Sequence, residues 1–121
     1  MHIQFAELPV RDQARAKEFY VKNLGCAVAA NAPMGSDGWR WIELKFSGAE
    51  TTLHFIRATK EDASDGPVLV LVCDDVASAV EDLRKKGVEI LTEPHSPPWQ
   101  PGRTVAEFRD SEGNRMVIGS R

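Results

Sequence analysis

One glutamate and one histidine are the strongest candidates for chemistry in this sequence. If Gly48 and Ala49 form a hairpin tip, counting outward along its two strands places Glu43 opposite His54 on the same face. A carboxylate beside an imidazole favours the protonated ring and fixes its tautomer. That suits a general base, but it is equally common in a structural pair. Glu43 and His54 are therefore the candidate catalytic residues, with the structural pair as the alternative.

Aromatic residues and carboxylates share the predicted face with this pair. Alternate residues of a strand lie on the same side. In the strand over 39–46, Ile42 and Leu44 suit a helix-covered core, which sends Trp39 and Trp41 to the other face. Indole rings stack on flat molecules and attract cations, each contact being worth about 0.5–2 kcal/mol. The pattern therefore predicts a cleft for a flat, partly cationic organic ligand.

The same alternation, applied to the other strands, gives the full set of predicted ligand-binding residues. They are Phe5, Glu7, Trp39, Trp41, His54, Val68, Glu107 and Val117, with Trp99 on a nearby loop. Two alternatives stay open. The tryptophans could pack against a partner subunit, and the carboxylates could form a solvated outer face.

The elements that position these residues form an internal repeat with a period of about sixty residues. Each half reads as a strand, a helix and three further strands. Asp12 and Gly25 bound the first helix, and Asp74 or Asp75 and Gly87 bound the second. The predicted strands are 3–10, 26–31, 39–46 and 51–57 in the first half, and 68–73, 88–93, 104–109 and 115–120 in the second.

This plan predicts an α+β fold made of two tandem βαβββ repeats. One domain is expected over 1–121, with repeat one at about 1–60 and repeat two at about 66–121, joined over 62–67. One helix covers only one face of a four-stranded sheet. The other face is where function is to be sought.

Composition excludes several classes of partner. The formal net charge is −3 and the basic residues are scattered, so no stripe could track the phosphates of a nucleic acid. The longest apolar run, 68–73, is far shorter than a membrane span, and the first residues lack a signal-peptide pattern. We expect a cytoplasmic protein that binds neither nucleic acid nor membrane. Cys26 and Cys73 lie in apolar stretches and read as buried, reduced thiols.

The sequence resembles the vicinal oxygen chelate superfamily, which includes glyoxalase I, extradiol dioxygenases, and fosfomycin- and bleomycin-resistance proteins. The resemblance lies in LPVRD at 8–12, the helix end over 18–25, and the closing hairpin FRDSEGN at 108–114. It implies paired repeats that form a curved mixed sheet, with the helices on the convex side and a cleft inside the curve. It also implies a homodimer, because a second chain often completes that sheet.

Members of the family with metal activity place one His, Gln or Glu ligand in each of four strands. The resemblance carries these places onto Phe5, His54, Val68 and Val117. Only His54 has a lone pair to offer, whereas a catalytic divalent site normally takes three protein ligands. We therefore expect no metal and no cofactor, with His54 as a weak metal candidate.

The resemblance thus favours a binding protein like the bleomycin-resistance members, which sequester a small molecule without a metal. Two alternatives would make the protein an enzyme. One is a metal-dependent lyase or dioxygenase that uses His54 with Glu7 or Glu107. The other is a metal-free enzyme that uses Glu43 and His54 as an acid/base pair. The fold does not choose among them.

Overall fold

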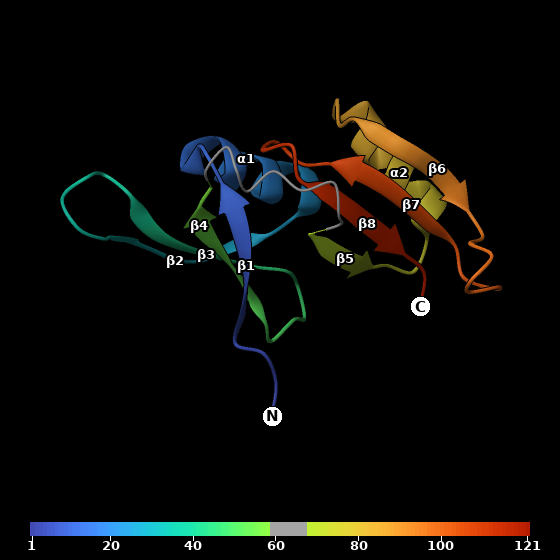
Figure 1. The fold of residues 1–121 in the computed structure, drawn as a ribbon, viewed down its shortest axis with the longest axis horizontal. Coiled ribbons are helices and arrows are strands. Elements are labelled where there is room, and N and C mark those ends of the chain that lie inside the picture. Colours follow the sequence, from blue (N-terminus) through green and yellow to red (C-terminus); the bar gives the residue numbers. More distant parts are fainter. Residues whose placement is uncertain (59–67) are drawn as a thin grey trace. The chain divides into compact units, whose positions relative to one another are not determined.

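The structure, a computed structural model, describes residues 1–58 and 68–121 (Figure 1). The chain divides into two compact units, Met1–Ala63 and Ser64–Arg121, each with its own four-stranded sheet. The predicted joint over 62–67 lies outside the described residues. No helix within the described ranges is long and apolar enough to cross a membrane.

Unit 1 follows the predicted order of one strand, one helix and three strands. Its elements are β1 (Phe5–Val10), α1 (Gln13–Leu24), β2 (Ala27–Pro33), β3 (Arg40–Lys45) and β4 (Thr52–Arg57). The sheet order is β1-β4-β3-β2, with β1 parallel to β4 and the other neighbours antiparallel. The strand β4 therefore lies between β1 and β3, and side chains from all three can meet.

Unit 2 repeats this plan. Its elements are β5 (Leu69–Val72), α2 (Val76–Lys85), β6 (Ile90–His95), β7 (Val105–Arg109) and β8 (Arg115–Gly119). The sheet order is β5-β8-β7-β6, with β5 parallel to β8. The α+β class and the two βαβββ repeats are thus confirmed. The largest shift is in β6, predicted over 88–93, where two register irregularities against β7 move the strand toward its carboxyl end.

Both helices begin at aspartate caps, as their sequences predict. Asp12 accepts a hydrogen bond from the backbone N–H of Arg15, and Asp75 accepts one from the N–H of Ser78, each at 3.0 Å. Asp75, and not Asp74, is therefore the cap of α2. Gly25 ends α1 in the left-handed conformation, with φ of 73°, which is the reason a glycine stands there.

The core of each unit lies between its helix and one face of its sheet. In unit 1 the fully buried side chains include Leu8, Tyr20, Leu44 and Phe55, which come from β1, α1, β3 and β4. The three strand residues among them are those that alternation assigns to the helix-covered side. Their neighbours along each strand point to the opposite face, and the predicted site residues of unit 1 are among them.

The cap assignment in α2 yields a direct test. We expect Asp75→Ala to lower the urea midpoint of unfolding, because the N–H of Ser78 loses its acceptor. Asp74→Ala is the matched control, since within the described residues Asp74 makes an exposed ion pair with Arg121 and caps no helix. Equal losses in the two variants, measured by circular dichroism, would contradict the assignment.

Candidate ligand-binding site

A row of three titratable side chains crosses the unit 1 sheet. His54 on β4 is paired in register with Glu7 on β1 and with Glu43 on β3. The predicted register of the β3–β4 hairpin, with Glu43 opposite His54, is therefore confirmed. Glu7 is exposed, Glu43 is half-buried and His54 is buried, so the imidazole is the least accessible of the three.

His54 lies within an aromatic cluster that joins three predicted site residues. Its ring stacks on Trp41, with centroids 3.9 Å apart and planes 29° apart. Phe5 meets the imidazole edge-on at 5.1 Å and Trp41 edge-on at 6.0 Å. His54 is 7% exposed, and its Nδ1 has no hydrogen-bond partner among the described residues. The cluster therefore contains a buried polar atom whose hydrogen-bonding capacity is unused.

Glu43 holds the tryptophan of this cluster in place. One carboxylate oxygen accepts a hydrogen bond from Trp41 Nε1 at 2.9 Å, and the other accepts one from Thr52 Oγ1 at 2.6 Å. These two bonds, that of Thr52 first, lower the pKa of Glu43 against the opposing effect of burial, and His54 adds a smaller electrostatic contribution. Among the described residues no hydrogen bond joins Glu43 to His54. An ionised carboxylate with a lowered pKa is a poor proton acceptor, so this geometry favours the structural alternative for the pair.

A pocket of about 540 Å³ lies beside His54, between β4 and the loop that joins β2 to β3. Its lining residues come from these two segments: Met34, Gly35, Ser36, Asp37, Trp39, His54, Phe55, Ile56 and Arg57. The structure thus brings Trp39 and His54 to one cavity. Trp41 contacts this cavity indirectly, by packing on the imidazole.

Asp37 and Arg57 shape the mouth of the pocket. The Arg57 guanidinium lies over the Trp39 ring, 4.7 Å from its centroid, and its Nη2 donates to Asp37 at 2.8 Å. The second Asp37 oxygen accepts the backbone N–H of Trp39 at 3.0 Å. That N–H first, and then Arg57, lowers the pKa of Asp37. Asp37, Trp39 and Arg57 therefore form one connected group.

Asp37 and Arg57 were not among the site residues predicted from the sequence. Alternation sends Arg57 to the side away from His54, and Asp37 lies in a loop where no period applies. The hairpin register gave no signal either, because counting outward from Glu43 and His54 puts Arg57 opposite Arg40, on the face away from Trp39.

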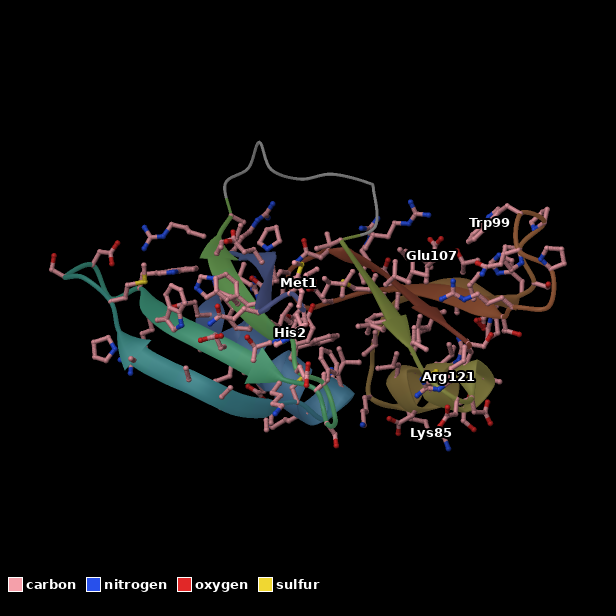
Figure 2. All side chains as sticks on the ribbon, turned by 90° about the horizontal axis from the view of Figure 1, so that it is seen from below. Met1, His2, Lys85, Trp99, Glu107 and Arg121 are labelled. Atoms are coloured by element: carbon pink, nitrogen blue, oxygen red, sulfur yellow. The ribbon has the colours of Figure 1, made fainter. Side chains whose placement is uncertain are left out.

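The remaining predicted residues belong to unit 2. Glu107 on β7 forms two hydrogen bonds with the Arg115 guanidinium, at 2.7 and 2.8 Å, and Arg115 lowers its pKa. Val117 is paired in register with Glu107, and the Val68 N–H donates to the Arg115 carbonyl. These three are neighbours within unit 2. Trp99 is 73% exposed on the loop between β6 and β7, where Figure 2 shows it away from the strands.

The residues at the metal-ligand places do not fit a metal ion. Phe5, Val68 and Val117 have no donor atoms, and His54 Nδ1 is buried in the aromatic cluster. Of the possible substitutes, Glu107 is engaged on both oxygens by Arg115. Residues 1–58 and 68–121 contain no group of three or more His, Cys, Asp or Glu that could hold an ion.

The thiols are not placed for nucleophilic chemistry. Cys26 is buried, and burial raises its pKa to about 11. Cys73 is half-buried rather than buried as predicted, because it lies just beyond the end of β5. Burial also raises its pKa. At neutral pH both are therefore poor sources of thiolate.

Comparison with known proteins identifies the family. The sequence profile of the Glyoxalase/Bleomycin resistance protein/Dioxygenase superfamily matches residues 2–118. This chain belongs to that superfamily. Its members commonly bind small molecules and are often dimeric.

Three relatives illustrate how the superfamily likeness extends over the chain. The uncharacterized protein YetH of Bacillus subtilis (strain 168) is 34% identical over 111 residues, which are 90% of this chain and 89% of YetH. TnmS3, an antibiotic-binding protein from Streptomyces sp. CB03234, is 30% identical, with a TM-score of 0.82 over 99% of this chain and 95% of its own. Glyoxalase I from Zea mays shares the fold at 20% identity, with a TM-score of 0.81, over 98% of this chain and 44% of its own.

The role of Glu43 predicts a pH effect. Because its pKa is lowered in the folded state, ionised Glu43 adds stability above the ordinary carboxyl pKa, and this contribution is lost as the pH falls through the lowered value. We expect Thr52→Val to raise the pKa of Glu43, measured by carbon NMR of the carboxyl group. We also expect it to reduce the difference in unfolding free energy between neutral pH and about pH 3.

Thr51→Val is the matched control, because the Thr51 hydroxyl donates to the Ile3 carbonyl and not to a carboxylate. An unchanged Glu43 titration in Thr52→Val, or an equal shift in Thr51→Val, would contradict this account of the carboxylate.

Proposed function

We propose that this superfamily member binds a flat organic molecule in the unit 1 pocket and sequesters it without a metal and without chemical change. The observation that carries the proposal is the pocket itself. An indole, an aliphatic wall at Ile56 and a buried imidazole border a cavity of about 540 Å³. A volume of this size suits a drug-sized ring system, and stacking on aromatic side chains supplies affinity that does not require a metal.

The 30% identity to TnmS3, an antibiotic-binding protein, also supports a binding role. The two enzymatic alternatives have less support. The metal-dependent lyase or dioxygenase needs donors beyond His54, and the metal-free acid/base pair needs a Glu43 that can accept a proton. The geometry at Glu43 and at Glu107 favours neither. A cytoplasmic location and the lack of nucleic-acid partners stay predictions.

Replacing the pocket tryptophan tests the proposal. We expect Trp39→Ala to weaken binding of a naphthalene-type probe by about tenfold, because one stacking surface is lost. Its unfolding free energy should fall by less than about 3 kcal/mol, since half-buried Trp39 is outside the core. Trp39→Phe should keep most of the affinity. Calorimetry and urea unfolding measure the two effects.

Unchanged affinity in Trp39→Ala together with a large loss of stability would make Trp39 a packing residue and reject the pocket. The same protein, purified without chelator or affinity tag, should be analysed for metals. A divalent ion at one equivalent per chain that the probe needs for binding would replace the metal-free proposal with the metal-dependent one.

We also propose that the protein is a homodimer. The strand β5 lies at an edge of the unit 2 sheet and carries Val70 and Val72, which are 56% and 52% exposed. An edge strand with exposed apolar side chains is a common site of association. We expect light scattering at micromolar concentration to give the mass of two chains, and Val70→Lys to shift it toward one chain. A wild-type protein that is monomeric under these conditions would contradict the proposal.

A further inference from the structure

We propose that the unit 1 pocket selects flat molecules that carry an anionic oxygen conjugated to the ring, a carboxylate or a phenolate, and that Arg57 is the residue that binds this oxygen. This inference rests on the proposed function, because it concerns the ligand of the same pocket. It reverses the charge expected from the sequence, which was partly cationic.

The carboxylates behind that expectation are already engaged. Glu43 accepts hydrogen bonds from Trp41 and Thr52, and Glu107 of unit 2 accepts two from Arg115. A carboxylate whose oxygens are each hydrogen-bonded to its own protein attracts a ligand cation less than an unpartnered one does. Glu7 is exposed on β1 and is not among the lining residues of the pocket.

Within the pocket, Asp37 and Arg57 are the residues with a full charge at neutral pH, and they are not equally available. Asp37 uses one oxygen for the Trp39 N–H and the other for Arg57. Arg57 has five N–H donors, and in the described parts of the chain only Nη2 makes a hydrogen bond. Of this charged pair, it is therefore mainly the cation, Arg57, whose N–H groups can bind a ligand.

The guanidinium is also held in one place. Stacking on Trp39 and the bond to Asp37 fix its plane at the mouth of the pocket, and its side chain is 55% exposed, so a ligand can reach it. A planar guanidinium can present two parallel N–H groups to one carboxylate, and one edge stays open when Asp37 uses a single nitrogen. A flat anion could then place its oxygen on Arg57 and its ring against Ile56 and the His54 side of the pocket.

A cationic ligand would be repelled by the same guanidinium and would find no available carboxylate in the pocket. The guanidinium already lies over one face of Trp39, so a second cation near that ring would be repelled by Arg57. Asp37 could attract it only by giving up its bonds to Trp39 and Arg57. The arrangement therefore discriminates by charge among molecules of one shape.

The test uses probes that share a naphthalene ring and differ in charge: 2-naphthoate, an acidic nitronaphthol ionised at neutral pH, neutral 2-naphthamide, and naphthylmethylammonium. Affinities of the full-length protein are measured by calorimetry. We expect the naphthoate to bind about tenfold more tightly than the amide, the size of one charge-assisted hydrogen bond, and the ammonium to bind most weakly. Binding of the nitronaphtholate with similar preference over the amide would extend the ligand class from carboxylates to phenolates, while its failure would confine it to carboxylates.

Arg57→Gln should lower the affinity for the naphthoate more than the affinity for the amide, and so abolish the advantage of the naphthoate. Arg121→Gln is the matched control, because Arg121 also makes an exposed ion pair with an aspartate, in unit 2. It should leave every affinity unchanged. Urea unfolding of both variants shows whether the fold is intact.

The outcomes separate the two proposals. If the four probes bind equally, or if the naphthoate keeps its advantage in Arg57→Gln, the anion inference is wrong and the flat-ligand pocket stands. Tightest binding of the ammonium would restore the cationic ligand and also reject Arg57 as the anchor. If no probe binds the wild-type protein, the proposed function fails, and the inference that rests on it fails with it.

Discussion

The register between β3 and β4 determines which side chains meet on the face opposite α1. With Glu43 opposite His54, the neighbouring positions put Leu44 against Leu53 in the core and leave Trp41 able to stack on the imidazole. A slip of one residue would send the buried leucines outward and the titratable residues into the core. The apolar core thus fixes the geometry of the polar face, because burying Leu44 and Leu53 permits only one pairing.

Much of the fold could be predicted from the sequence, because helix caps and strand alternation are set by nearby residues. Asp12 and Gly25, and Asp75 and Gly87 in the second half, occur at matching places, and local rules of capping apply to them without knowledge of the rest of the chain. Alternation in β1, β3 and β4 assigned Leu8, Leu44 and Phe55 to the core, and all three are fully buried. The strand whose bounds moved most is β6, where irregular pairing with β7 breaks the period of two on which such reasoning depends.

The candidate site was less predictable for a physical reason. Alternation tells which face a residue occupies, but the partner of a long polar side chain depends on distances across strands and loops. Glu43 was placed correctly opposite His54, yet its carboxylate bonds to Trp41 on its own strand and to Thr52 on the diagonal. Asp37 lies in a loop with no regular period, so its pairing with Arg57 follows only from the folded path of that loop.

Glu43 and His54 are kept from acid/base chemistry in two different ways. Both residues suggest acid/base chemistry by type, but proton transfer needs an accessible base whose pKa is near the working pH. Glu43 is held ionised by two donors, and His54 is enclosed by Trp41 and Phe5 with its Nδ1 buried. The hydrogen bond from Trp41 to Glu43 aligns the indole with the imidazole, so the carboxylate acts on the shape of the aromatic surface. Polar residues that in another setting would move protons here hold an indole against a buried imidazole, with Phe5 edge-on to both rings.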